Sequence, residues 1–127
     1  MTPTIVLEDP PKDSSSARPA LRLVLGSPGG GTIINTVLEV LLNALVYHLD
    51  IQQAVNLPRF HNQWMPDKVF LERDGFSTDT VEKLRAAGYK IQWIDSIGEC
   101  EAIEIDSKTG WRFSAADARG DGKAVGY

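Results

Sequence analysis

A glycine-rich turn between two apolar patterns constrains this chain most. Residues 21–25 place leucines at alternate positions, which is typical of a strand with one buried face. The turn 26–32 (GSPGGGT) follows, and apolar residues then recur at helical spacing over 33–46. A strand that passes through glycines into a long helix predicts a layered α/β or α+β chain.

The other patterns extend this prediction to the element order ββααβαβββ. Asp50 begins a capping-box sequence that opens a second helix, and Pro58 ends that helix. Ser77 is a suitable N-cap for a helix over 78–87, with Gly88 placed for its left-handed C-cap. Strands are predicted at 4–7, 21–25, 69–71, 89–94, 102–105 and 111–115, and loops at 9–19 and 117–127.

The long helix is expected to be buried on most sides. Val40 and Ala44 widen its apolar face, and only Asn35, Glu39 and Asn43 mark a narrow polar edge. The edge strands of the predicted sheet are expected to need partners from other segments, or from a second copy of the chain.

Length and composition narrow the function classes. The chain has 127 residues, which fits a single piece, and 43% of them are hydrophobic, enough for a core. A net charge of −4 without basic clusters argues against a nucleic-acid partner. No apolar run approaches the length of a membrane span, and no signal pattern opens the sequence. An exported parent protein remains open, because its signal would lie upstream.

The glycine turn is the strongest candidate site. A helix N-terminus exposes unpaired N–H groups and a partial positive charge, and glycines let a bound oxygen approach the backbone closely. The turn could therefore hold a phosphate, a carboxylate or a developing oxyanion. It is not a phosphate-binding P-loop, because no Gly-Lys-Ser/Thr follows. The alternative is a tight turn that only delivers the strand into the helix.

Two histidines offer weaker candidates. His61 could act as a general base, but no nucleophile lies nearby in sequence, so a structural histidine with hydrogen-bonded ring nitrogens is favoured. His48 lies at the end of the long helix, where we expect it to cap carbonyl groups. Without clustered carboxylates or cysteines beside them, no metal site is expected.

Three further residues near the C-terminus carry titratable groups. Asp117 and Asp121 could form a carboxylate pair, but a solvated loop or a backbone turn is the commoner use of such residues. Cys100 is the only cysteine, so it forms no internal disulfide, and its flanking glutamates should raise its thiol pKa.

Several motifs resemble gamma-glutamyltransferases, in the same order along the chain. They are residues 1–6 (MTPTIV), the turn 26–30 (GSPGG) with 33–38 (IINTVL), Ala54 with 58–64 (PRFHNQW), 75–80 (GFSTDT), and 117–119 (DAR) with 124–127 (AVGY). The matches run from the first residue to the last, which makes the resemblance specific to the C-terminal part of that family's small subunit.

The resemblance implies a fold and an activity. The family has a four-layered αββα sandwich of the N-terminal-nucleophile type, and its precursor cuts itself into a large and a small subunit. The new N-terminal Thr attacks a gamma-glutamyl substrate such as glutathione, and the group passes to water or an amino acid without an organic cofactor. By position, Gly29 and Gly30 match the glycines whose N–H groups form the oxyanion hole.

Other functional parts of the family lie upstream of the segment that Met1 matches. They include the nucleophile, so this chain is expected to contain none, and the groups that hold the glutamyl α-carboxylate and α-amine. Trimming of Met1 would expose Thr2, but Pro3 follows, and the match places Thr2 in a strand, so Thr2 is not expected to be the nucleophile. The resemblance also suggests a periplasmic or secreted parent, and partner segments from the large subunit and the upstream small subunit.

The chain departs from the family in three places. Thr2 replaces a serine, Ala118 replaces a proline, and residues 97–102 (IGECEA) carry two carboxylates where the family has small polar residues. The last difference puts the packing of that strand in doubt. The alternatives to an enzyme segment are a non-catalytic free-standing relic, a subunit that pairs with another chain, and a small-anion binding module.

Overall fold

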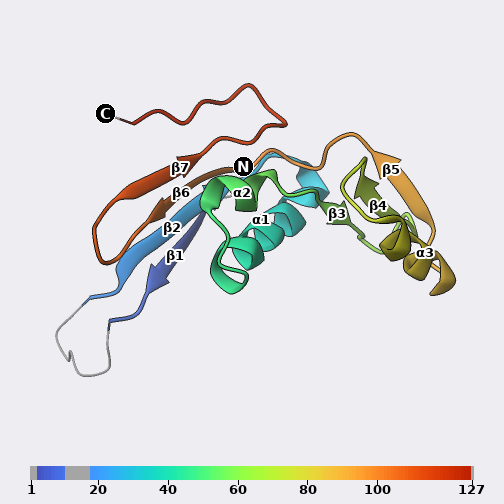
Figure 1. The fold of residues 1–127 in the computed structure, drawn as a ribbon, viewed down its shortest axis with the longest axis horizontal. Helices are drawn as coiled ribbons and strands as arrows, with labels where there is room; N and C mark the ends of the chain where they lie inside the picture. Colours follow the sequence, from blue (N-terminus) through green and yellow to red (C-terminus); the bar gives the residue numbers. More distant parts are fainter. Residues whose placement is uncertain (1–2, 11–17, 127) are drawn as a thin grey trace.

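The computed structural model describes residues 3–10 and 18–126, so Thr2 and most of the loop predicted at 9–19 lie outside it (Figure 1). A four-stranded antiparallel sheet has the order β1-β2-β6-β7. Its strands are β1 (Thr4–Glu8), β2 (Ala20–Gly26), β6 (Glu101–Ile105) and β7 (Arg112–Ala115). Between β2 and β6 the chain forms two covering helices and a second, smaller sheet.

The helices over the first sheet follow the glycine turn. A short 3₁₀ turn (Gly30–Thr32) leads into α1 (Ile33–Leu41), which continues as a π-helical turn, η2 (Leu42–Val46), before α2 (Ile51–Asn56). The expected helix over 33–46 is therefore confirmed in extent, although its last turn is wider than α-helical. Asp50 caps α2 as predicted, since its carboxylate accepts hydrogen bonds from Gln52 N and Gln53 N.

The smaller sheet has the order β3-β4-β5. It consists of β3 (Phe60–His61), β4 (Val69–Glu72) and β5 (Ile91–Ile94), and α3 (Thr78–Ala86) connects the parallel pair β4 and β5. Ser77 and Gly88 cap α3 as predicted, the first through Thr80 N and the second at φ 94°. The predicted element order is confirmed except for β3, which is too short to leave a pattern.

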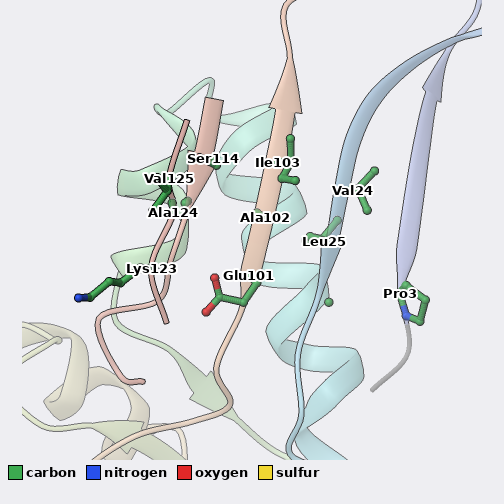
Figure 2. Close-up of a pocket in the computed structure, with 12 residues that line it drawn as sticks. Pro3, Val24, Leu25, Glu101, Ala102, Ile103, Ser114, Lys123, Ala124 and Val125 are labelled. Carbon is green, nitrogen blue, oxygen red and sulfur yellow. The ribbon is translucent and has the colours of Figure 1, made fainter. Parts of the chain in front are cut away.

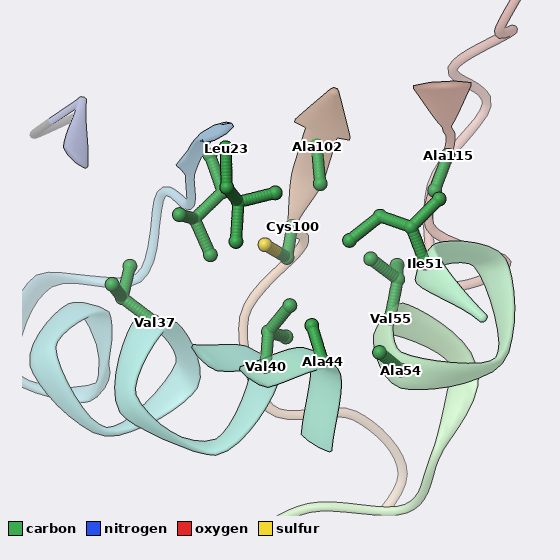
Figure 3. Close-up of a cluster of buried hydrophobic side chains, with 11 residues drawn as sticks. Leu23, Val37, Val40, Ala44, Ile51, Ala54, Val55, Cys100, Ala102 and Ala115 are labelled. Carbon is green, nitrogen blue, oxygen red and sulfur yellow. The ribbon is translucent and has the colours of Figure 1, made fainter. Parts of the chain in front are cut away.

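The main core lies between the first sheet and its helices (Figure 3). Leu23 points from β2 toward the helices, and it packs in one buried cluster with Leu25, Val40 of α1 and Val55 of α2. One helical layer on one sheet gives the chain its α+β class and is consistent with its being part of the αββα sandwich that the resemblance implies. A second, smaller core packs Val81 of α3 against β4.

The expected burial of the long helix on most sides is wrong. Ile34 is 81% exposed and Leu38 is 50% exposed, and Leu42 and Val46 continue the same exposed row. The helix has only one sheet to cover, so its outer apolar face has no packing partner in the described residues. None of the helices in that part of the chain has the length and apolarity to cross a membrane.

Candidate active site

The glycine turn has the backbone geometry that only glycines adopt readily. Gly29 has φ 133° and Gly30 has φ 58°, and both residues are exposed. Within residues 3–10 and 18–126, neither N–H group donates a hydrogen bond. These donors are therefore free to bind an oxygen atom at the start of the helical segment, where the partial positive charge of a helix lies.

Thr32 stabilises the turn through two hydrogen bonds. Its backbone N–H and its hydroxyl both donate to the carbonyl oxygen of Gly29, at 3.2 and 3.0 Å. A Cβ atom on Gly29 would lie 2.4 Å from that hydroxyl oxygen, so a side chain at residue 29 does not fit. The turn thus depends on glycine both for its φ angles and for its packing.

The loop before β6 packs against the residues that flank the turn. Ser27 is buried and its hydroxyl accepts a hydrogen bond from Glu99 N at 3.0 Å. Gly98 has φ 65°, and a Cβ atom there would lie 2.5 Å from Thr36 Oγ1 and 2.8 Å from Ser27 Oγ. The carboxylates of Glu99 and Glu101 therefore do not prevent this segment from packing.

His61 lies beside the turn and is only 6% exposed. Its Nε2 is 3.0 Å from Gln63 Oε1, and the two residues line a cavity of about 230 Å³ together with Thr32 and Ser96. The expectation of a structural histidine is confirmed for this nitrogen, whereas Nδ1 is buried without a partner in the described residues. His48 bonds no carbonyl through its side chain in that part of the chain; its backbone instead ends the helix at φ 54°.

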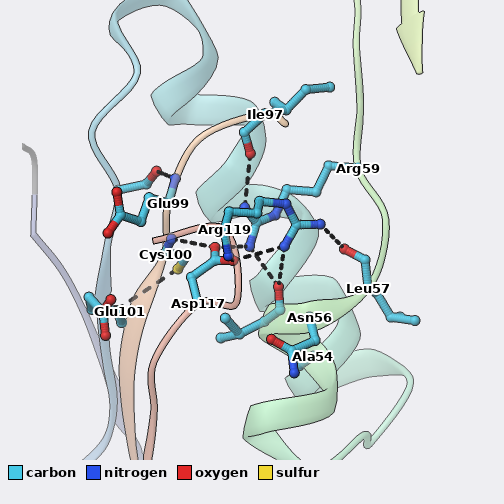
Figure 4. A network of polar contacts seen from close by, with 12 residues as sticks. Ala54, Asn56, Leu57, Arg59, Ile97, Glu99, Cys100, Glu101, Asp117 and Arg119 are labelled. Atoms are coloured by element: carbon cyan, nitrogen blue, oxygen red, sulfur yellow. Dashed lines mark hydrogen bonds and ion pairs between the residues drawn. The ribbon is translucent and has the colours of Figure 1, made fainter. Parts of the chain in front are cut away.

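A buried ion-pair network connects α2, β4, the start of β6 and the C-terminal segment (Figure 4). Arg59 Nη2 lies 2.7 Å from Asp117 Oδ2, and the two side chains are 2% and 0% exposed. The same guanidinium donates to the carbonyl oxygens of Val55 and Ile97. Asp117 also accepts from Cys100 N at 2.7 Å, so it connects the C-terminal segment to the start of β6.

Glu72 and Arg119 complete the network. Glu72 accepts hydrogen bonds from the backbone N–H groups of Arg59 and Ile97, at 2.8 and 2.7 Å. Arg119 donates to both Glu72 and Asp117 and also reaches the carbonyl oxygen of Leu57. Two guanidinium groups and two carboxylates balance in charge, which is what a buried cluster of this kind requires.

The carboxylates of this network are held in their ionised form. Burial opposes ionisation of Asp117, but hydrogen bonds from Cys100, Arg119 and Arg59 outweigh burial and lower its pKa. Burial acts in the same direction on Glu72, and its bonds from Arg119, Arg59 and Ile97 likewise lower its pKa. Both groups therefore act as fixed anions in the interior.

Two expectations about this region change. Asp117 is neither solvated nor paired with Asp121, because it is buried against two arginines while Asp121 is exposed. Cys100 has its pKa raised to about 11, chiefly by burial and only in part by Glu101. In the described part of the chain, no three His, Cys, Asp or Glu side chains gather as a metal site would require.

The sheet face opposite the helices carries a shallow apolar groove (Figure 2). Val24, Ile103 and Ser114 occupy paired positions on β2, β6 and β7, and Lys123 and Val125 of the C-terminal segment line its edge. The groove has a volume of about 380 Å³. Among the described residues, the groove has no cluster of titratable side chains like the one around Arg59. The glycine turn, which has free N–H donors in that part of the chain, is therefore the better candidate for chemistry.

Comparison with known proteins identifies the family to which the chain belongs. The sequence model of the gamma-glutamyltranspeptidase family, described as "Gamma-glutamyltranspeptidase", matches residues 1–127. The chain belongs to the gamma-glutamyltranspeptidase family. Its resemblance in motif order and its α+β class, as part of an N-terminal-nucleophile sandwich, are both confirmed.

Individual relatives give the extent of the match. The glutathione hydrolase proenzyme of Escherichia coli is 39% identical over 128 residues, covering 100% of this chain and 20% of the relative. The Bacillus subtilis strain 168 glutathione hydrolase proenzyme is 34% identical, covering 99% and 20%. The chain thus spans about a fifth of the length of the curated relatives it matches.

Solved structures of gamma-glutamyltranspeptidases superpose on this chain. A Helicobacter pylori gamma-glutamyltranspeptidase T380A mutant superposes with a TM-score of 0.82 at 37% identity, covering 94% of this chain and 61% of that chain. The Pseudomonas nitroreducens gamma-glutamyltranspeptidase complexed with L-DON gives a TM-score of 0.84 at 28% identity, covering 100% and 62%. The described fold is therefore the one that members of this family adopt over the matching segment.

Proposed function

We propose that this chain is the segment of a gamma-glutamyltransferase that stabilises the oxyanion, while a threonine from another segment supplies the nucleophile. The substrate is a gamma-glutamyl compound such as glutathione, and the acceptor is water or an amino acid. The single observation that carries the proposal is the pair of exposed glycines, Gly29 and Gly30, whose N–H groups lack acceptors in the described residues.

The chemistry assigned to the turn is electrostatic. When the threonine oxygen bonds to the γ-carbonyl carbon, the electron pair of the C=O bond moves onto the carbonyl oxygen. Two N–H donors at the start of a helical segment stabilise that negative charge, and fixed donors cost no reorganisation during the reaction. The proton of the threonine hydroxyl passes to that threonine's own α-amine, the tetrahedral intermediate collapses, the C–N bond breaks, and the leaving nitrogen takes this proton. The γ-glutamyl ester left on the threonine is then cleaved by water or an amino acid, which regenerates the hydroxyl.

The test is a chimeric enzyme. This chain replaces the matching 20% of the Escherichia coli glutathione hydrolase proenzyme, and the matured two-subunit product is isolated and assayed with a γ-glutamyl anilide. We expect turnover by the chimera and none by the 127-residue chain alone. Turnover by the isolated chain near the rate of the chimera would contradict the assignment of the nucleophile to another segment.

Gly30→Pro is the informative variant, because proline has no N–H group and does not adopt φ 58°. Removal of one oxyanion donor lowers kcat by roughly 10²–10³-fold. Gly110→Pro is a demanding control, since Gly110 has φ 73° in the β6–β7 turn and its N–H also donates to the carbonyl oxygen of Asp106, so this variant suffers at least as much local damage. Equal kcat values for the two proline variants would remove the glycine turn from the reaction.

A second candidate is a non-catalytic subunit or relic that pairs with another chain. The exposed row on the long helix favours pairing of some kind, because large apolar side chains such as Ile34 and Leu38 are open to solvent. A matured chimera without any turnover would favour this candidate over an enzyme segment.

A further inference from the structure

His61 and Gln63 make an ordered contact with the glycine turn. Gln63 Nε2 donates to the carbonyl oxygen of Met65 at 3.1 Å, which orients the amide so that Oε1 faces His61. An acceptor at Oε1 requires a donor at His61 Nε2, 3.0 Å away. His61 therefore donates through Nε2, and its buried Nδ1 has no partner in the described residues.

The same amide oxygen touches the turn. A Cβ atom on Gly31 would lie 2.6 Å from Gln63 Oε1, so the amide occupies the space beside the Gly31 backbone. Gly31 directly follows Gly30, and Thr32 holds the turn from the other side through the Gly29 carbonyl. The glycines of the turn stay exposed, but Thr32 bonds the Gly29 carbonyl oxygen on one side of the turn and the Gln63 amide lies beside Gly31 on the other.

We propose that His61 and Gln63 are positioning residues that hold the N–H groups of Gly29 and Gly30 in the orientation that binds the oxyanion. This inference rests on the proposed function of the glycine turn. His61 acts through Gln63, whose amide lies beside Gly31. His61 itself neither touches the substrate nor transfers a proton. The arrangement assigns a role to the 58–64 motif, which carries no nucleophile of its own.

The cavity beside this pair supports a role in catalysis rather than in folding alone. Thr32, His61 and Gln63 line the same space of about 230 Å³, next to the exposed glycines. His61 is buried, but Gln63 and the glycines of the turn are exposed, so the pair is not enclosed within the core. The pair instead lies where the turn faces a solvent-connected hollow.

The test uses the matured chimeric enzyme and the variants His61→Ala, Gln63→Ala and the double variant. An oxyanion hole acts mainly in the transition state, so misorientation lowers kcat while KM changes little. We expect each single variant to lower kcat about tenfold, a fraction of the loss on removal of a donor. The double variant should lose no more than either single one, because both residues act through one contact.

Two further variants separate positioning from a general loss of structure. His61→Gln keeps an N–H donor toward Gln63 and should restore most of kcat, whereas a merely packed histidine would gain nothing from that donor. His48→Asn removes the other histidine, exposed and in a left-handed conformation that Asn tolerates, and should leave kcat and KM unchanged.

The outcomes separate the two proposals. An active chimera in which His61→Ala and Gln63→Ala keep the parental kcat overturns the positioning role and leaves the function of the turn intact. A fall in kcat with independent, multiplicative effects of the two substitutions also overturns it. A matured but inactive parent chimera overturns the proposed function, and with it this inference. Thermal unfolding of every variant, recorded beside the kinetics, identifies any variant whose kcat falls because the protein no longer folds.

Discussion

The guanidinium of Arg59 and the carboxylate of Asp117 lie 2.7 Å apart in the interior, although 58 residues separate them in sequence. Each also bonds backbone groups, so the pair holds α2, the start of β6 and the C-terminal segment together. A buried pair of this kind fixes the geometry of the segments around it, and its loss is costly because one charge is left without a partner.

Replacing Asp117 by Asn should therefore destabilise the protein by about 3–5 kcal/mol. Urea unfolding at neutral pH measures the change. Asp95→Asn is the matched control, because Asp95 pairs with Arg73 at the same 2.7 Å but the two side chains are 90% and 60% exposed. We expect the control to cost no more than about 1 kcal/mol. Similar costs for the two variants would show that the interior pair adds nothing beyond a surface pair.

Stability should fall in acid because of the same network. Asp117 and Glu72 have lowered pKa values in the folded state, so they stabilise the fold above their unfolded values, about 4. That contribution is lost as the pH falls through the lower folded values. A urea-unfolding series from pH 6 to pH 2 should show the decline in the parent, and Asp117→Asn should show a smaller one. An equally steep decline in both proteins would assign the acid sensitivity to other groups.

Glu39 should produce the opposite pH dependence. Burial raises its pKa to about 7, so the fold favours the protonated form, and stability falls as the pH rises from about 4.5 to 7. Glu39→Gln resembles the protonated acid and should raise stability at pH 8 by about 1 kcal/mol, since solvent screening reduces the effect at a partly exposed group. At pH 5 the variant and the parent should unfold at nearly the same urea concentration. A pH-independent difference would contradict the assignment.

Gly98 should tolerate alanine far less well than Gly88. Both have positive φ, 65° and 94°, but only at Gly98 would a Cβ atom meet other atoms, Thr36 Oγ1 at 2.5 Å and Ser27 Oγ at 2.8 Å. Gly88→Ala should cost about 1 kcal/mol from backbone strain alone, and Gly98→Ala about 2–3 kcal/mol from strain and overpacking. Calorimetric unfolding of both variants decides whether the support below the glycine turn is as tight as described.

The exposed helix face should drive association of the isolated chain. Sedimentation at rising concentration should show self-association, and the double variant Ile34→Glu with Leu38→Glu should shift the chain toward monomer. Gln53→Glu adds charge at an exposed position on α2 and should leave association unchanged. A parent chain that stays monomeric at high concentration would contradict the prediction, and with it the expectation of a homo-oligomer.

Local signals made most of the fold predictable. The caps at Ser77 and Gly88, the alternation in β2 and the glycine turn each depend on residues adjacent in sequence, and each is confirmed. The short strand β3 was missed because its two residues, Phe60–His61, are too few to leave a local pattern. The burial of the long helix was overestimated, since periodicity identifies an apolar face without identifying what covers it.

The site was predictable in part and for a similar reason. The glycine turn is a contiguous motif, so its position follows from the sequence alone, whereas the positive φ angles of Gly29 and Gly30 are known only from the structure. The role of Gly29 and Gly30 as donors stays a prediction. Asp117 was predicted to lie in a solvated loop or to hold a backbone turn. It does hold a turn, through Arg119 N and Gly120 N, but its burial against Arg59 was missed because the two charges are distant in sequence and only the fold brings them together. The contact of Gln63 with Gly31 likewise depends on packing, which spacing does not encode.

The Arg59 pair also has a consequence for synthesis on the ribosome. Arg59 is synthesised before Asp117. For a time the nascent chain therefore contains the arginine without the carboxylate that neutralises its charge in the interior. Burying that charge early is costly, so α2 and β6 gain their final packing only after residue 117 has left the exit tunnel. A chain cut short before residue 117 leaves the Arg59 guanidinium without its carboxylate, so stable packing of α2 depends on a residue 58 positions further along the chain.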